Sequence, residues 1–197
     1  ILFNTKMVRA ILDGRKDATR RIVKGFIPDD AVWGYTAFTP KGYISCRGTF
    51  ADGYGEKFFK LPCESGDILY VRETWMDYAG LTMYKADCDI YRLDSLNFAG
   101  FVWHPSIHMP KEAARIWLKV TNVRVERLQK IAPQGAWKEG ARCSCLHPVP
   151  DCAGNKTAFV NIWNSTIKKS DIDRYGWDAN PWVWVIEFER CEKPEGV

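Results

Sequence analysis

A lysine and a threonine three residues apart are the first side chains in this sequence whose types and spacing suit a reaction. Lys16 and Thr19 lie in the segment GRKDATRR, together with Arg15, Arg20 and Arg21. A threonine hydroxyl becomes a nucleophile when a base removes its proton, and a lysine can do so when burial or neighbouring cations lower its pKa. The spacing alone favours a plainer interpretation, a helix end whose cations interact with the last carbonyls, with Thr19 starting a strand.

Two glutamates are candidate acids or bases. Glu73, in VRETW, lies within a predicted strand beside Arg72 and aromatic residues. Its surroundings favour a structural ion pair, with a site acid as the alternative. Glu139, in WKEGA, lies at a predicted helix end, where a glutamate is normally solvated. Nothing in its local sequence marks Glu139 as catalytic.

The segment WHPSIHMP is a candidate surface for binding a nucleobase. Its two prolines restrict the backbone, so its side chains should be held in place. Trp103 can stack on a base, and Ser106 or His108 can form hydrogen bonds with it. The alternative is a loop that packs on the fold and has no ligand.

The segment CSCLHPVPDC holds enough ligands for a zinc ion. The candidates are Cys143, Cys145, His147 and Cys152. The spacing C-x-C-x-H-x4-C is not a common zinc pattern, and two prolines limit how the loop closes. We therefore expect a cysteine-rich loop without metal, and zinc is the less favoured alternative.

Charge and composition narrow the function classes. The net charge of +4 is only mildly basic, so the position of the cations matters more than their number. Six cations fall between Arg9 and Lys24, and a second basic group lies between Arg115 and Lys130. Nucleic-acid contact is one hypothesis for these groups, and the alternative is that both are solvated faces. No apolar run approaches the roughly 20 residues of a membrane span. Seven scattered cysteines and the absence of a signal peptide predict a cytoplasmic protein with reduced thiols.

The hydrophobic pattern predicts an α+β protein. A short helix is expected over 5–16, several short strands between 33 and 61, a hairpin of 83–87 against 89–93, and long strands over 114–128 and 182–191. Short helices are expected over 129–141 and 156–167. Strands interrupted by two or three helices suggest a small β-barrel with helical additions.

The order of these motifs resembles the ASCH-domain family, and most closely its prophage-encoded members in enteric bacteria. The motifs that carry the resemblance are ILDGRKDATRR, GDILYVRETW, WHPSIHMP, LKVTNVRVERLQKI, and IWNSTI followed by WVWVIEFER. The resemblance implies one PUA-like β-barrel domain over 1–197, with flanking short helices, inserted hairpins and insertions at about 24–64 and 142–154. It also implies RNA or a modified nucleoside as the partner.

One branch of the family removes the acetyl group from 4-acetylcytidine with a lysine and a threonine in a G-R-K-x-x-T motif and a glutamate after the central strand. The resemblance places these roles on Lys16, Thr19 and Glu139. Lys16 would activate Thr19, and Glu139 would move a proton to the leaving amine or hold the exocyclic nitrogen. No cofactor or catalytic metal is implied. The binding residues would be Arg15, Arg20, Arg21, Glu73, Trp75, Trp103, Ser106 and His108.

Other functions stay open at this point. Asp17 lies next to Lys16 and would favour its protonated form, which weakens it as a base. The chain is also much longer than the small amidohydrolases of the family. A non-catalytic RNA-binding module, an ASCH-type ribonuclease, or a phage protein that binds a host protein are the alternatives.

Overall fold

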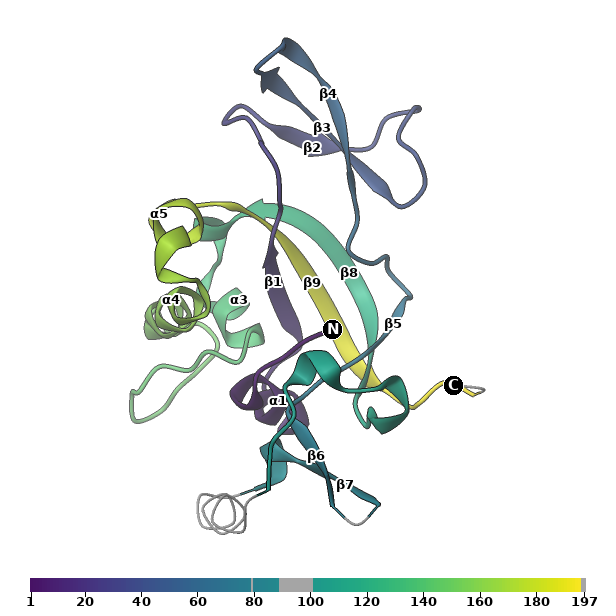
Figure 1. Ribbon diagram of the computed structural model, residues 1–197. Coiled ribbons are helices and arrows are strands. Elements are labelled where there is room, and N and C mark those ends of the chain that lie inside the picture. The colour runs from purple at the N-terminus through teal and green to yellow at the C-terminus, as the bar shows by residue number, and fades with distance from the viewer. Residues whose placement is uncertain (79, 89–100, 196–197) are drawn as a thin grey trace. The chain divides into compact units, whose positions relative to one another are not determined.

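Antiparallel strands and short helices make up the protein, which a computed structural model describes over residues 1–78, 80–88 and 101–195 (Figure 1). The chain divides into two compact units. Unit 1 comprises Ile1–Asp17, Ile68–Lys119 and Phe188–Val197, and unit 2 comprises Ala18–Asp67 and Val120–Glu187. The α+β class predicted from the sequence is confirmed.

The largest sheet has the strand order β1-β9-β8-β5. Its strands are β1 (Ala18–Ile22), β5 (Ile68–Tyr70), β8 (Trp117–Arg127) and β9 (Trp182–Cys191). In unit 2, β1 runs antiparallel to β9, with Ala18 opposite Glu187 and Ile22 opposite Val183. In unit 1, β5 runs antiparallel to β8. The described strands form three sheets, and these do not close into a barrel.

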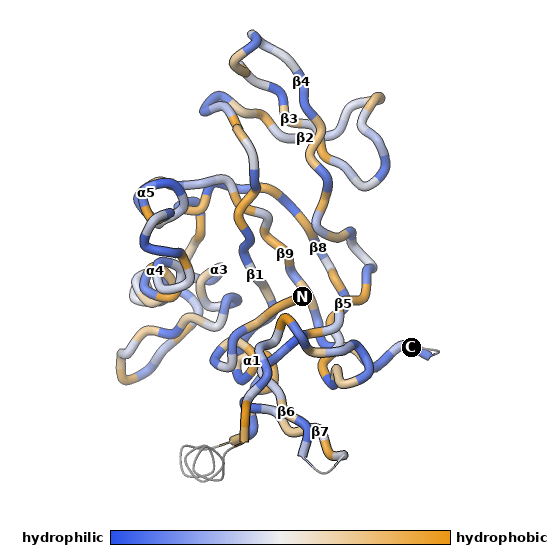
Figure 2. Tube along the Cα trace, in the orientation of Figure 1, coloured by the Kyte–Doolittle hydropathy of each residue, from blue (hydrophilic) through white to orange (hydrophobic). Residues whose placement is uncertain are grey.

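Hydrophobic residues recur along β9 (Figure 2). Val183 and Val185 point to one face and Trp184 and Ile186 to the other, and all four are buried. A strand covered on both sides reads as a continuous apolar run, which explains the pattern WVWVIEF. The long strands expected near 114–128 and 182–191 are confirmed as β8 and β9.

Three helices of unit 2 follow β8. They are α3 (Pro133–Lys138), α4 (Gly154–Thr166) and α5 (Ile172–Tyr175). Pro133 occupies the first turn of α3, where its missing N–H costs no hydrogen bond. The core that joins these helices to β9 consists of Leu128, Ile131, Ala136, Ala141, Phe159, Trp163, Val183 and Val185. α3 and α4 therefore pack against the face of β9 that bears Val183 and Val185.

The predicted insertion at 24–64 folds as a separate three-stranded sheet of unit 2. Its strands are β2 (Val32–Gly34), β3 (Tyr43–Phe50) and β4 (Gly53–Lys60), all antiparallel. Trp33 packs edge-on against Phe59 and Trp184, with ring centroids 5.1 and 6.2 Å away. These contacts attach β2 and β4 to β9.

Unit 1 contains α1 (Thr5–Leu12), whose N-terminus is capped by the Asn4 side chain. The helix ends two residues before Gly14, which has a positive φ of 67°. Unit 1 also contains the hairpin β6 (Trp75–Tyr78) and β7 (Leu81–Tyr84). The predicted hairpin of 83–87 against 89–93 differs from this, because 85–87 form a 3-10 turn and 89–93 lie outside the described residues. The 3-10 turns are η1 (Lys85–Asp87), η2 (Ser106–His108), η3 (Lys111–Ala113), η4 (Leu128–Lys130) and η5 (Lys169–Asp171).

The helices of the described residues are all short or polar. None of them combines the length and the hydrophobicity that crossing a lipid bilayer requires.

Candidate functional site

Strand β1 divides the residues of the GRKDATRR segment between two faces. Neighbouring strand residues point to opposite sides of a sheet. Thr19 and Arg21 lie opposite Ile186 and Trp184 and share the face of those residues. Arg20 lies opposite Val185 and points to the face that α3 and α4 cover.

Arg20 is buried on the helical face, where it meets two carboxylates. Its Nη1 donates to Oε1 of Glu139 over 3.2 Å, and its Nη2 lies 3.5 Å from Oε2 of Glu126. The guanidinium also lies over the ring of Phe159, 5.8 Å from its centroid. Only 3% of the Arg20 side chain is exposed, so these partners compensate the cost of burying its charge.

Further charges continue this cluster across β8 and β9. Arg124 donates to Glu126 over 2.6 Å and to Glu187 over 2.9 Å, and Lys138 lies 3.7 Å from Glu187. Burial raises the pKa of Glu187, but the hydrogen bonds and charges of Arg124 and Lys138 outweigh it and hold the pKa below its ordinary value. Burial alone would lower the pKa of Arg124. The hydrogen bonds and charges of Glu126 and Glu187 outweigh burial and raise the pKa above its ordinary value.

Glu139 is buried, unlike the solvated glutamate that its local sequence suggested. It caps the C-terminus of α3, where its N–H donates to the carbonyls of Gly135 and Ala136. Only 7% of its side chain is exposed. Because α3 packs beside β1, the helix end directs this carboxylate to Arg20.

A pocket of about 340 Å³ opens on the other face of β1. Its lining consists of Arg21, Ile22, Val23, Lys24, Phe59, Lys60, Pro62 and Trp184, and we call it the basic pocket. This volume falls in the range of about 300–1,000 Å³ typical of small-molecule sites. The lining contains three cations and no acidic residue, and two aromatic side chains form part of its wall.

Thr19 belongs to the same strand face as Arg21. Residues two apart on a strand are separated by roughly 7 Å, and Thr19 itself is not part of the pocket lining. Thr19 is 2% exposed. Burial lowers the pKa of Arg21, and the charge of Glu139 opposes this effect, so the carboxylate acts electrostatically on an arginine of the pocket.

Lys16 belongs to unit 1 and follows α1. Its backbone N–H donates to the carbonyl of Ala10 over 3.0 Å, and its Nζ lies 5.6 Å from the ring centroid of Phe3. Lys16 is 3% exposed. The spacing favoured a helix end followed by a strand that starts at Thr19, and β1 begins one residue earlier, at Ala18.

Glu73 forms a buried ion pair in unit 1. Arg115 binds both carboxylate oxygens of Glu73, at 2.9 and 3.1 Å, and both oxygens of Asp87, and lies over the ring of Tyr84. Burial raises the pKa of Glu73 in spite of Arg115. For Arg115, the two carboxylates outweigh burial and raise its pKa. The partner of Glu73 is therefore Arg115, while the neighbouring Arg72 donates to the carbonyl of Ile107.

The predicted nucleobase-binding residues of the WHPSIHMP segment also belong to unit 1. Trp75 forms an isolated antiparallel bridge with His104, and their ring centroids lie 5.1 Å apart. Nζ of Lys85 lies 6.0 Å from the centroid of Trp103. Ser106 and His108 lie in η2. The basic pocket, by contrast, is built from residues of unit 2.

The remaining predicted residues lie on the surface or in the cysteine loop. Arg15 forms an exposed ion pair with Asp13 at 2.7 Å. The sulfur atoms of Cys143, Cys145 and Cys152 come within 4.8 Å of one another, whereas the imidazole of His147 is not part of this group.

Several residues of these sites were not singled out from the sequence. Lys24 belonged to the noted basic cluster, but nothing linked it to Lys60 and Phe59 of β4. For Trp184, the only sequence signal was its position in the apolar run WVWVIEF. Arg115 and Arg124 appeared in the second basic group, without their carboxylate partners.

Comparison with known proteins adds no relative. No family model matches the chain, and neither a curated protein nor a solved structure matches it. The ASCH resemblance therefore stays a prediction from the motifs.

Proposed function

We propose that this protein binds RNA or a modified nucleoside in the basic pocket and hydrolyses an N-acylated base such as 4-acetylcytidine. The observation that carries the proposal is the basic pocket itself. Three cations and two aromatic rings line it, and the buried Thr19 lies two residues before Arg21 on the same face of β1. The PUA-like barrel is part of the same proposal, supported by the antiparallel sheet and its flanking helices.

The lining of the basic pocket suits the two parts of a nucleotide. Arg21, Lys24 and Lys60 supply positive charge for phosphate oxygens. Phe59 and Trp184 supply apolar wall for a flat base or sugar. A ligand of this chemistry is anionic and partly aromatic, which fits a nucleotide better than an acidic peptide.

The proposed reaction is acyl transfer to Thr19. Its Oγ1 attacks the amide carbonyl carbon, and its proton passes to the amine of Lys16, three residues earlier in the chain. The C–N bond then breaks, the exocyclic nitrogen takes that proton, and cytidine leaves. Water hydrolyses the threonine ester and releases acetate. Glu139 assists proton transfer to the leaving amine, and Arg20 anchors its carboxylate.

Burial of the three proposed groups supports a chemical role. Lys16 and Thr19 are 3% and 2% exposed, and the Glu139 side chain is 7% exposed. Arg20 gives the burial of Glu139 a structural reason, and the same ion pair holds the carboxylate in place for the proposed proton transfer.

A non-catalytic RNA reader is the second candidate. The cations of the basic pocket favour it directly, because phosphate binding requires neither Lys16 nor Thr19. Its affinity for RNA would fall steeply as salt rises.

Purified protein incubated with 4-acetylcytidine distinguishes these functions. Chromatography of cytidine and acetate is expected to show turnover that Thr19→Val abolishes and Thr19→Ser partly retains, since serine keeps the hydroxyl. RNA binding without turnover, weakening steeply with salt, supports the reader. Absence of both turnover and RNA binding rules out the proposal.

A further inference from the structure

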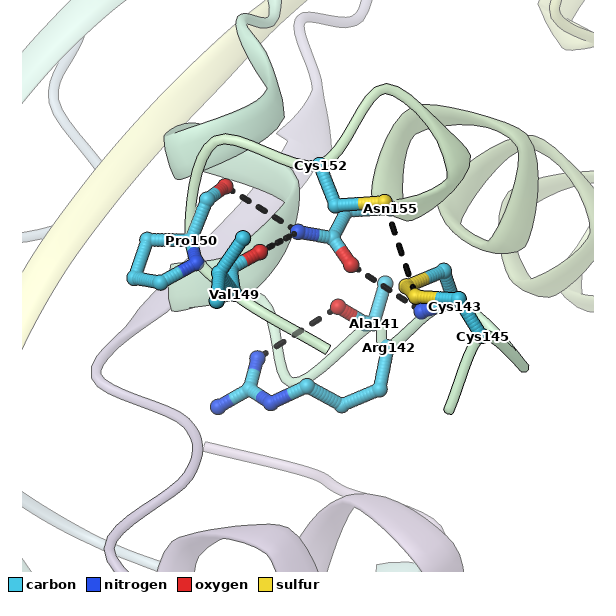
Figure 3. The surroundings of a disulfide bond; sticks show 8 residues. All are labelled: Ala141, Arg142, Cys143, Cys145, Val149, Pro150, Cys152 and Asn155. Carbon is cyan, nitrogen blue, oxygen red and sulfur yellow. Dashed lines mark hydrogen bonds between the residues drawn. A yellow bond between two sulfur atoms is a disulfide. The ribbon is translucent and has the colours of Figure 1, made fainter. Parts of the chain in front are cut away.

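Three cysteine sulfurs converge in front of α4 (Figure 3). The sulfurs of Cys143, Cys145 and Cys152 lie within 4.8 Å of one another, and those of Cys145 and Cys152 are 3.7 Å apart. Four ligands at the Zn–S distance of about 2.3 Å in a tetrahedron are separated by roughly 3.8 Å. The separation of Cys145 from Cys152 therefore matches one edge of a zinc–thiolate tetrahedron.

Asn155 fixes the loop that presents these sulfurs. It is fully buried, and its Oδ1 accepts from the N–H of Cys143 over 3.0 Å. Its Nδ2 donates to the carbonyls of Val149 and Pro150 at 2.8 and 3.0 Å (Figure 3). One side chain thereby ties Cys143 to the segment just before Cys152, so the sulfurs are brought together by a defined structure.

Gly154 allows the two ends of the loop to approach closely. A Cβ atom added at Gly154 would lie 2.7 Å from Cβ of Cys143, closer than real Cβ atoms come. Any side chain at this position would push Cys143 away from Cys152. The glycine is therefore part of the structure that brings the sulfurs together.

Cys152 comes just before α4, which begins at Gly154. The guanidinium of Arg142 points away from the three sulfurs (Figure 3) and lies over the ring of Trp137, 3.3 Å from its centroid. The thiolate is the form of cysteine that binds metal.

We propose that Cys143, Cys145 and Cys152 bind one Zn²⁺ ion in the reduced protein, with solvent in the fourth position. Solvent is assigned there because His147 does not join the three sulfurs. The site ties the loop at 142–154 to the start of α4. The spacing of these ligands in the sequence is uncommon for zinc. Metal binding depends on the positions of the sulfur atoms in the folded loop, and not on that spacing.

A disulfide between Cys143 and Cys145 is the competing state of the same atoms. A dithiol reductant transfers two electrons and two protons to this bond, which gives two thiols and the oxidised reductant. Each of the three cysteines then loses its proton on binding Zn²⁺. In the disulfide form only Cys152 of the three keeps a thiol, so that form cannot supply three thiolates to Zn²⁺.

Zinc titration of the full chain tests the proposal. The protein is reduced with a phosphine, freed of metal with a chelator, and titrated with Zn²⁺ against a chromogenic chelator. One equivalent is expected to bind, and Co²⁺ in its place should give thiolate charge-transfer and tetrahedral ligand-field bands. Cys152→Ser should weaken Zn²⁺ binding at least about tenfold, whereas Cys191→Ser should leave it unchanged.

Each remaining outcome decides a part of the proposal. Zinc well below one equivalent in the reduced wild type, with its circular dichroism retained, overturns the site. Equal Zn²⁺ affinity of Cys152→Ser and wild type does the same. His147→Ala should bind Zn²⁺ as the wild type does, and a tenfold loss would replace the solvent ligand with His147. The readout is metal binding, so it is independent of any turnover of a nucleoside.

Discussion

The guanidinium of Arg20 donates to Oε1 of Glu139 over 3.2 Å and so joins two residues that are 119 positions apart in the chain. Arg20 comes from the middle of β1 and Glu139 from the C-terminus of α3. Both side chains are buried, and Glu126 lies near the same guanidinium. The pair connects the strand that bears Thr19 to the helix layer above it.

We expect Arg20→Met to destabilise the protein by about 3–5 kcal/mol, because the buried carboxylate of Glu139 loses the guanidinium that donates to it. Urea unfolding followed by tryptophan fluorescence measures the change. Arg15→Met is the matched control, since Arg15 and its partner Asp13 are both exposed and such pairs contribute at most about 1 kcal/mol. A loss below that of Arg15→Met would contradict the role of the pair.

The ion pairs of Glu187 make stability depend on pH. Its pKa is lower in the folded state, so its stabilisation is present above its ordinary pKa and is lost as pH falls through the folded value. We expect Glu187→Gln to lose up to about 1 kcal/mol near neutral pH and to lose less stability than the wild type on acidification. Urea midpoints between about pH 6 and about pH 3 measure this. Parallel pH curves of the two proteins would show that Glu187 contributes nothing.

Lys60 is expected to contact a phosphate in the basic pocket. Lys60→Ala should weaken RNA binding and reduce the slope of log K against log salt by about 1, because one fewer counterion is released. Fluorescence anisotropy at several salt concentrations measures the slope. Lys57→Ala is the control, because Lys57 lies on the same strand outside the pocket and pairs with Asp52 at 3.6 Å. Equal slopes for the two variants would exclude Lys60 from the interface.

Thr19 is expected to be the nucleophile of the proposed amidohydrolase. Thr19→Val should lower kcat for 4-acetylcytidine by at least about a thousandfold, while Kd for the same nucleoside changes little, since the pocket lining is untouched. Single-turnover kinetics and equilibrium binding separate the two quantities. If Thr19→Val retains wild-type kcat, the nucleophile is another group.

Gly154→Ala should destabilise the protein by about 1–3 kcal/mol, because the new methyl group would overlap Cβ of Cys143. The same variant should weaken Zn²⁺ binding, since the overlap moves Cys143. Gly55→Ala is the control, because a Cβ there meets nothing within 4 Å. Thermal unfolding with and without Zn²⁺ measures both effects, and equal melting temperatures of the two variants would contradict the close approach.

The sequence by itself determined the local structure of this protein. The apolar stripe of α1 and its stop at Gly14, the alternation of β8, and the apolar run of β9 all follow from contacts within a few residues. Such periodicity is a property of neighbouring residues, so it can be predicted without knowledge of the rest of the chain.

Only the tertiary structure decided which side chains meet. Glu73 lies next to Arg72 in sequence but pairs with Arg115, 42 positions away. The basic pocket forms because β4 places Lys60 and Phe59 near Arg21. The three cysteines lie close together in a loop that Asn155 holds through the N–H of Cys143. Ion pairs and pockets depend on strand register and on helix packing, which long-range contacts set. A local pattern cannot determine them, because the same residues in another register would face other partners.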